Sequence, residues 1–306
     1  MINKTIDFVG KQTYTLILSA LLLVASIVSL FTNGLNLGVD FTGGVLVEIG
    51  FDKKTNLNDI RLQLEKENFK EASVQYFGSD TEVLIRLGLQ KKSSAKISSQ
   101  IIRALNFDNQ KPDIRRVEFV GPKIGEELTN DGGLAMLYAL IGILIYVAFR
   151  FEYRFALGSI AALVHDVIIT IGFFSIFGLE FDLTILAAIL AVIGYSLNDT
   201  IVVFDRIREN FINTRKSDSK IIVNGALNQT LARTLRTSLT TILVLLALFF
   251  LGGKIIHGFA TALLIGVIIG TYSSIYVAST MVLILGITKE NLLPSEKEKK
   301  EIDSRP

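Results

Sequence analysis

The sequence predicts a polytopic α-helical membrane protein with six transmembrane helices and a ferredoxin-like α+β extracytoplasmic domain between helices 1 and 2. Half of the 306 residues are hydrophobic, only 20% are charged and the mean hydropathy is +0.49. Soluble domains average about 25% charged residues, so this composition favours a membrane protein. Six stretches are apolar enough to cross a bilayer, and the region between the first two is richer in charge, which predicts a folded domain there.

The apolar stretches match the roughly 20 helical residues that a ~30 Å hydrocarbon core requires. They are Thr13–Phe31, Gly132–Phe149, Phe155–Phe177, Phe181–Phe204, Thr237–Leu251 and Phe259–Ile287. The first run exceeds the about 7–15 residues of a signal-peptide core, so we interpret it as an uncleaved span.

Lysine and arginine residues between the spans predict the orientation, because cytoplasmic loops carry an excess of them. They gather before span 1, between spans 2 and 3, between spans 4 and 5, and after span 6. Both termini are therefore expected in the cytoplasm. The expected organisation is a cytoplasmic N-terminus with helix 1 (1–33), a periplasmic ferredoxin-like domain (34–131), a five-helix bundle (132–288) with a cytoplasmic loop (205–236), and a cytoplasmic tail (289–306).

The region between spans 1 and 2 shows short elements in the order β-α-β-β-α-β, which is the ferredoxin-like arrangement. The expected strands and helices are Gly44–Phe51, Leu57–Asn68, Ala72–Phe77, Glu82–Leu87, Ser93–Leu105 and Ile114–Val120. No phosphate loop or nucleophile elbow accompanies them, so we interpret this domain as a binding or mechanical module.

A glycine-rich segment precedes the first strand of this domain. Its residues are Asp40, Phe41, Thr42, Gly43 and Gly44. The segment is either a turn that lets the chain leave the membrane and enter a sheet, or a functional motif, and the residues leave both open.

Composition also excludes several function classes. The chain has no cysteine, which rules out disulfides, thiolate chemistry and cysteine-bound metals. A net charge of +2 argues against nucleic-acid binding. Two histidines and scattered carboxylates leave little for a metal site, so we expect no metal, no cofactor and no enzymatic activity.

Polar residues inside the spans are costly, at roughly 2.5–3.5 kcal/mol for an aspartate, so each needs a reason. Span 3 contains His165 and Asp166 near its middle. Two interpretations stay open. The pair forms interhelical hydrogen bonds that hold the bundle together, or it serves as a proton relay, since histidine titrates near neutral pH.

Span 4 contains Asn198 and Asp199, and span 5 is preceded by Arg233 and Arg236. Either arginine could reach towards Asp199. A buried acid beside a cation can load and release a proton as helices move, which favours a proton site over a purely structural pair.

After span 4, the chain continues into a basic amphipathic stretch that contains Asp205, Arg206 and Arg208. This pattern predicts a cytoplasmic helix at the membrane surface or against a partner. Span 6 contains Gly266 and Gly270, a spacing typical of close helix packing.

These residues resemble the SecF family of bacterial protein-export membrane proteins. The similarity lies in Leu37–Gly44 (LGVDFTGG), Gly194–Asn210 (GYSLNDTIVVFDRIREN) and Thr234–Leu243 (TLRTSLTTIL), together with the His165-Asp166 stretch and Val120-Gly121-Pro122. The order of one span, an outside domain and five more spans also agrees.

The resemblance implies a subunit of the Sec translocase in the bacterial inner membrane. Such a subunit would pair with SecD, act beside SecYEG and possibly YajC, and use the proton-motive force to help exported polypeptides across. It belongs to the RND group of proton-driven transporters, and its membrane proton site would fall on Asp199 with Arg233. Three alternatives stay open: a non-energised scaffold, half of an RND-type small-molecule exporter, and an intramembrane enzyme that uses His165 and Asp166.

Overall fold

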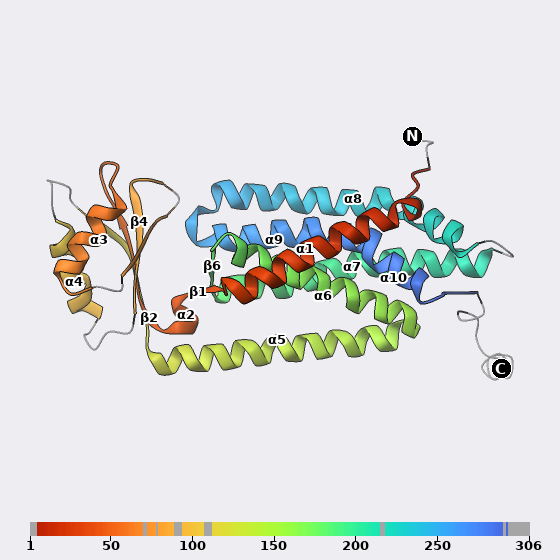
Figure 1. Ribbon diagram of the computed structural model, residues 1–306, viewed down its shortest axis with the longest axis horizontal. Helices are drawn as coiled ribbons and strands as arrows, with labels where there is room; N and C mark the ends of the chain where they lie inside the picture. The colour runs from red at the N-terminus through yellow and green to blue at the C-terminus, as the bar shows by residue number, and fades with distance from the viewer. Residues whose placement is uncertain are drawn as a thin grey trace, which may run out of the picture. The chain divides into compact units, whose positions relative to one another are not determined.

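The computed structural model describes residues 5–69, 72–77, 79–88, 94–106, 112–214, 218–289 and 292. The predicted tail, 289–306, therefore falls almost entirely outside the described residues. The chain divides into two compact units. The helical unit comprises Met1–Leu35, Leu137–Leu179 and Ala187–Pro306, and the sheet unit comprises Asn36–Met136 and Glu180–Leu186. Figure 1 shows both units, with labels on most of their elements.

Six helices of the described chain are long and apolar enough to cross a membrane, which confirms the six predicted spans. After a short 3-10 turn, η1 (Val9–Lys11), they are α1 (Gln12–Thr32), α5 (Pro122–Arg150), α6 (Tyr153–Ile176), α7 (Leu183–Asn213), α8 (Ser219–Leu251) and α9 (Gly253–Ser273). The last continues through a π-helical turn, η2 (Ser274–Ala278), into α10 (Ser279–Ile284).

Three helices extend further than the apolar runs predicted. Helix α5 begins at Pro122, well before Gly132; a proline suits this first position because it needs no N–H there. The region 205–236 was predicted as a cytoplasmic loop that begins with an amphipathic helix. It is mostly helical, because α7 runs on to Asn213 and α8 already starts at Ser219. Helix α7 continues because Ile207 and Phe211 are buried on one face, at i and i+4, and keep packing against the bundle.

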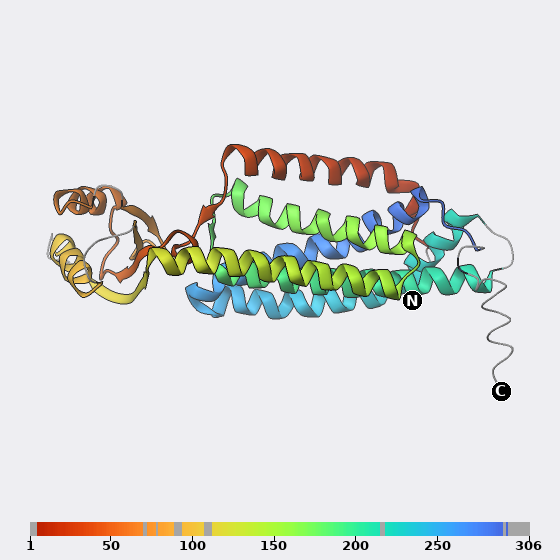
Figure 2. The same cartoon turned by 90° about the horizontal axis from the view of Figure 1, so that it is seen from below.

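Small residues bring the bundle helices close together. Gly172 on α6 faces Ser26 on α1 with no room for a side chain, and Ser29 hydrogen-bonds to Ser175 at 2.8 Å. Figure 2 shows α1 and α6 side by side. Close backbone approach through small residues and interhelical hydrogen bonds is how helices associate in membranes, where the hydrophobic effect between helices is absent.

The GxxxG motif of α9 packs against α7. A Cβ atom added at Gly266 would overlap the side chain of Val192, and one at Gly270 would lie 3.0 Å from the Cβ of Ser196. The sequence predicted close packing at this motif without naming the partner helix, and α7 is that partner.

The sheet unit contains the elements predicted for the outside domain, in the predicted order. They are β2 (Gly44–Gly50), α3 (Leu57–Lys66), β3 (Ser73–Tyr76), β4 (Glu82–Leu87), α4 (Ser94–Leu105) and β5 (Asp113–Val120). The sheet is antiparallel in the order β3-β4-β2-β5. Ile60 and Leu64 of α3 and Ile97 and Ile101 of α4 share one buried core with the strands, so both helices cover the same face of the sheet.

A short segment joins this sheet to α1. It forms β1 (Asn36–Leu37) and a single helical turn, α2 (Val39–Thr42), and β1 pairs in parallel with β6 (Glu180–Phe181) between α6 and α7. Gly43 and Gly44 have φ of 67° and 136°, and a Cβ at Gly44 would collide with the Leu87 carbonyl oxygen. Backbone geometry therefore requires glycine at both positions.

Candidate functional site

Asp166 on α6 is the centre of a buried hydrogen-bond cluster that joins three helices. Its side chain is 1% exposed. Its Oδ2 accepts hydrogen bonds from Ser196 on α7 at 2.5 Å and from Ser273 on α9 at 2.7 Å. Ser273 comes directly before the π-helical turn η2, a feature that often marks functional sites. Asp166 thus satisfies two buried hydroxyls on two neighbouring helices at once.

His165 contributes to the same cluster from the adjacent position. Its Nδ1 lies 2.9 Å from Oδ1 of Asp166, and its ring stacks on Tyr272 of α9 with centroids 6.2 Å apart. Its other ring nitrogen, Nε2, is buried without a hydrogen-bond partner in the described chain. The aromatic contact with Tyr272 and the contact with Asp166 hold the ring in place, while Nε2 makes no hydrogen bond to the described residues.

Asp199 lies one turn further along α7, on the same face as Ser196. It is 2% exposed, and its Oδ2 has no hydrogen-bond partner among the described residues. The groups that interact with its carboxylate come from α8: the side chains of Thr237 and Ser238, and the guanidinium of Arg233 through its charge. No ion pair is formed between Asp199 and Arg233 within the described residues, and Arg233 is exposed.

Two residues predicted for the relay lie outside this cluster. Asn198 is exposed, because neighbouring helix positions point about 100° apart and Asp199 occupies the buried face. Arg236 is also exposed, and Arg233 is the arginine whose charge acts on Asp199. The bundle therefore places four of the predicted residues at buried contacts between helices or next to such contacts. They are Asp199, Arg233, His165 and Asp166.

Asp205 and Arg206 make surface ion pairs near the end of α7. Asp205 accepts two hydrogen bonds of 2.9 Å from Arg150 at the end of α5, and Arg206 pairs with Glu209 at 2.7 Å. Arg208 is exposed. Ion pairs with side chains this exposed contribute at most about 1 kcal/mol, so they add little to the packing of α7.

The glycine-rich segment holds the start of α7. Oδ2 of Asp40 accepts a hydrogen bond of 3.1 Å from the backbone N–H of Leu183, the first residue of α7. Phe41 stacks on Phe181 with centroids 6.1 Å apart, and Thr42 donates to the Gly38 carbonyl.

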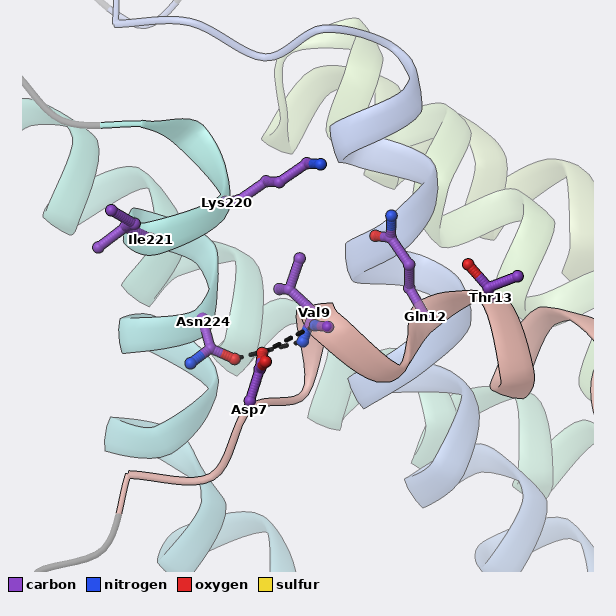
Figure 3. A pocket seen from close by; sticks show the side chains of 8 residues that line it. Asp7, Val9, Gln12, Thr13, Lys220, Ile221 and Asn224 are labelled. Atoms are coloured by element: carbon purple, nitrogen blue, oxygen red, sulfur yellow. Dashed lines mark hydrogen bonds between the residues drawn. The ribbon is translucent and has the colours of Figure 1, made fainter.

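A polar pocket of about 420 Å³ lies elsewhere, where the N-terminal segment meets α8. Figure 3 shows Asp7 and Asn224 among its lining residues. Asn224 accepts hydrogen bonds from the N–H groups of Phe8 and Val9. None of the predicted site residues lines this pocket, and no group of three or more metal-ligating side chains occurs in the described residues.

The sequence did not single out several residues of these clusters. Ser273 and Tyr272 sit in an apolar span where serine and tyrosine are unremarkable, and only the fold brings them to Asp166. Arg86 on β4 carried a weak signal, because it is a charged residue among the apolar residues that follow Glu82 in this strand.

Known proteins match this chain over nearly its whole length. A family model for the C-terminal part of the protein export membrane proteins SecD and SecF matches residues 100–288, and a model for the SecD/SecF GG motif matches residues 28–55. The protein translocase subunit SecF of Vibrio alginolyticus is 53% identical over 99% of this chain and 98% of its own length. The SecF of Pseudomonas aeruginosa is 46% identical over 99% of this chain and 98% of its own length.

Solved structures agree with this result. A crystal structure of SecDF, a translocon-associated membrane protein from Thermus thermophilus, is 39% identical, covers 93% of this chain and superimposes with a TM-score of 0.86. SecDF in a super-membrane-facing form is 37% identical, covers the whole chain and gives a TM-score of 0.66. The chain spans 39% and 41% of those two SecDF chains. By its family models, its relatives and its fold, the chain belongs to the SecF family of protein translocase subunits.

Proposed function

We propose that this chain works with SecD as a proton-driven subunit that helps polypeptides leave the SecYEG channel on the outer side of the inner membrane. The observation that carries the proposal is Asp199, a carboxyl group on a spanning helix that is 2% exposed and has one oxygen without a hydrogen-bond partner in the described residues. An intramembrane acid of this kind is a functional-site candidate by default, because insertion of an acid is costly. YajC is a further possible partner, and the role requires neither a cofactor nor enzymatic chemistry.

Protonation of Asp199 would change the contact between α7 and α8. The ionised carboxylate attracts the exposed guanidinium of Arg233, whereas the neutral acid does not. A unit charge that crosses 100 mV releases ~2.3 kcal/mol, and ~1.4 kcal/mol is a factor of ten, so one proton can bias two arrangements about fifty-fold. Arg233 lies at the exposed side of the contact between α7 and α8. Its polar side chain would let a proton enter or leave the site of Asp199 there.

Asp166 and His165 complete the proposed relay as a second polar centre. Ser196 connects the two acids, because its hydroxyl bonds to Asp166 and its position lies one turn before Asp199. The unpartnered Nε2 of His165 supports a role in proton transfer. The cluster also limits how α7 can move, since any shift of α7 against α6 and α9 must break or exchange the bonds of Asp166. Asn198 and Arg236 are left as surface residues beside the relay.

The proposed topology places both termini in the cytoplasm and the sheet unit in the periplasm. The support is the basic residues at one side of the spans, as the positive-inside rule requires. We assign the sheet unit to the ferredoxin-like class; its β-α-β-β-α-β element order and antiparallel strand order support this. Single cysteines placed in this cysteine-free chain would test the orientation. An exposed α3 position such as Glu65 should react with an impermeant thiol reagent from outside, and Arg208 only after the membrane is opened.

The experiment for the proton role compares Asp199→Asn with a control on the same helix, Asp205→Asn. Both variants are co-expressed with SecD in a strain that lacks the native chain, and export under a proton gradient is measured. We expect Asp199→Asn to lose most of the gradient-dependent export and Asp205→Asn to keep it. Full export by an Asp199→Asn variant that inserts and pairs with SecD would refute the proton role.

A non-energised scaffold is the second candidate. The observation that favours it is the Asp166 cluster, in which two serine hydroxyls bind one carboxylate and hold three helices together. The exchange Asp199→Arg with Arg233→Asp separates the two functions. A scaffold should recover activity, because opposite charges still face each other, whereas a proton carrier should not. Relatives named as protein translocase subunits give no support to a small-molecule exporter.

A further inference from the structure

We propose that the segment from Asp40 to Gly44 is a joint that fixes the outer end of α7 to the sheet of the outside domain, with Asp40 and Arg86 as its positioning residues. Helix α7 carries Asp199, so the joint would pass a movement of that helix to the domain. The consequence for export rests on the proposed function; the joint itself does not.

The first contact is made by Asp40. Its carboxylate accepts the N–H of Leu183 at 3.1 Å, while Asp182 accepts the N–H of Ile185 at 3.0 Å. The first N–H groups of a helix have no partner within the helix, and negative charge is favourable at this end. Asp182 is a local cap, because it directly precedes the helix that it caps. Asp40 is a second cap from 143 residues earlier in the chain, so it ties the helix start to α2.

The second contact is made by Arg86, whose side chain reaches from β4 of the sheet to β1 and β6. Its Nη1 donates to Oδ1 of Asn36 at 3.0 Å and to the carbonyl of Leu37 at 3.2 Å, and its Nη2 pairs with Glu180 at 2.5 Å. The Arg86 side chain is 17% exposed. One guanidinium thus holds both β1 and β6, which pair with each other in parallel. A planar group with five donors can bind several acceptors at once, which a lysine cannot do in this geometry.

Apolar packing holds α2 between the sheet and the helices. Val39 of α2 is 3% exposed and packs with Leu46 of β2 and Leu84 of β4, on the sheet face opposite to α3 and α4. On its other side, Gly125 of α5 lies so close to the backbone of Phe41 and Gly43 that a Cβ there would approach within 2.9 Å. The segment is therefore packed on β2, β4 and α5, and in addition Asp40 contacts the start of α7.

The joint matters because α7 is continuous. The helix starts at Leu183, among residues of the sheet unit, and runs without a break past Asp199 to Asn213. A loop between a moving helix and a domain would absorb a small shift, whereas a capped helix start that is packed on the domain would follow it. Asp40 and Arg86 contact no reacting group, so they act by position alone.

The test measures how firmly the joint holds. Cysteines replace two exposed residues of the sheet unit, Glu65 on α3 and Thr184 at the start of α7, in this cysteine-free chain. Spin labels on them report a distance distribution in the complex with SecD, without a proton gradient. We expect one narrow distribution in the parent. Asp40→Ala and Arg86→Gln should each at least double its width. Asp40→Asn keeps an oxygen for the Leu183 N–H and should stay narrow. Arg115→Gln, an exposed arginine of the same domain, is the control.

Two further measurements on the same samples separate positioning from simple damage. Asp40→Ala should lose at least fivefold in gradient-driven export while the infrared carboxyl signal of Asp199 stays as in the parent. Unchanged widths in both Asp40→Ala and Arg86→Gln would overturn the joint, and a doubled width with full export would overturn its positioning role. Failure of the proton role would give a different result. The infrared carboxyl signal of Asp199 would then not change with the proton gradient, while the widths of the spin-label distance distributions would still differ between the parent and the joint variants.

Discussion

The hydroxyl of Ser196 on α7 donates a hydrogen bond of 2.5 Å to Oδ2 of Asp166 on α6, one helical turn before Asp199. Ser273 on α9 donates to the same oxygen at 2.7 Å. Asp166 and Asp199, the two buried acids among the described residues of the bundle, are thus connected through a single turn of α7. The bonds of Asp166 hold the helix that carries Asp199 in place against α6 and α9.

Removal of the Ser196 hydroxyl should weaken the contact between α7 and α6. Interhelical hydrogen bonds in membrane proteins are worth about 0.6 kcal/mol on average and up to about 1.7 kcal/mol. We expect Ser196→Ala to lower the free energy of unfolding by an amount in this range, measured by denaturation in mixed micelles. Asp166→Leu should cost more, because two hydroxyls and a histidine nitrogen then lose their acceptor. Equal stability of Asp166→Leu and the parent would contradict the structural part of this account.

Glycine substitutions test the contact between α7 and α9. A Cβ at Gly270 would lie 3.0 Å from the Cβ of Ser196, so Gly270→Ala must push the helices apart, at a cost of about 1–3 kcal/mol. At Gly194, in the same span as Asp199, an added Cβ meets nothing within 4 Å. Gly194→Ala should therefore be neutral or stabilising by up to about 1 kcal/mol, because alanine is the better helix former. Thermal unfolding of the two variants measures the difference, and the opposite order would exclude this packing.

The carboxyl group of Glu180 on β6 should make the stability of the sheet unit depend on pH. Burial raises the pKa of this carboxyl group, with the nearby Asp182 and Asp40 adding to the shift, while Arg86 opposes it. The folded state therefore holds the Glu180 proton more tightly than the unfolded state. The stability due to this group is fully present below its unfolded pKa and is lost as the pH rises through the raised one.

Glu180→Gln should consequently unfold at the same temperature as the parent in acid and at an equal or higher temperature near pH 7. Glutamine can still accept a hydrogen bond from Arg86, so the local contact is kept. The measurement is the melting temperature of both proteins between pH 4 and pH 8, with the exposed Glu65→Gln as control. A parent that gains stability over Glu180→Gln as the pH rises would show that the pairing with Arg86 dominates instead.

The N-terminal segment depends on two asparagines of α8. Asn224 and Asn228 bind the backbone of Ile6 and Phe8 through their side-chain oxygen and nitrogen atoms. We expect Asn228→Ala to speed amide hydrogen exchange at Ile6 at least tenfold. Asn228→Asp keeps the oxygen that accepts the Ile6 N–H and should show a smaller increase. Equal exchange in all three proteins would mean that the segment is held by the packing of Phe8 on Tyr276 alone.

Most elements of this fold follow from local sequence. The apolar runs predict the six spans, and short apolar runs next to turn residues predict the strands Gly44–Phe51 and Glu82–Leu87. The order of elements in the outside domain follows in the same way. The amphipathic pattern after span 4 predicted a helix there, but the apolar run ends at Phe204, so its continuity with α7 up to Asn213 is seen only in the structure.

The clusters could be predicted only in part. Asp199 and Asp166 were recognised because an acid in an apolar run is rare. Arg233 was predicted beside Asp199, whereas the serine partners of Asp166 were not recognised, since Ser273 is 107 residues away in the sequence. The contact of Asp40 with Leu183, across 143 residues, was not predicted either. Such contacts depend on how helices pack, and a single sequence contains no local pattern for them. Asn198 shows that proximity in sequence does not place a residue on the same face: it adjoins Asp199 and lies on the exposed face of α7.

The most direct test of the proton role is infrared difference spectroscopy of the chain with SecD in vesicles, recorded with and without a proton gradient. Subtraction of the Asp199→Asn spectrum isolates the carboxyl band of Asp199. We predict that this band appears when protons are supplied from the periplasmic side and disappears when the gradient is removed. An Asp199 that stays ionised under both conditions, while gradient-driven export continues, would contradict the account.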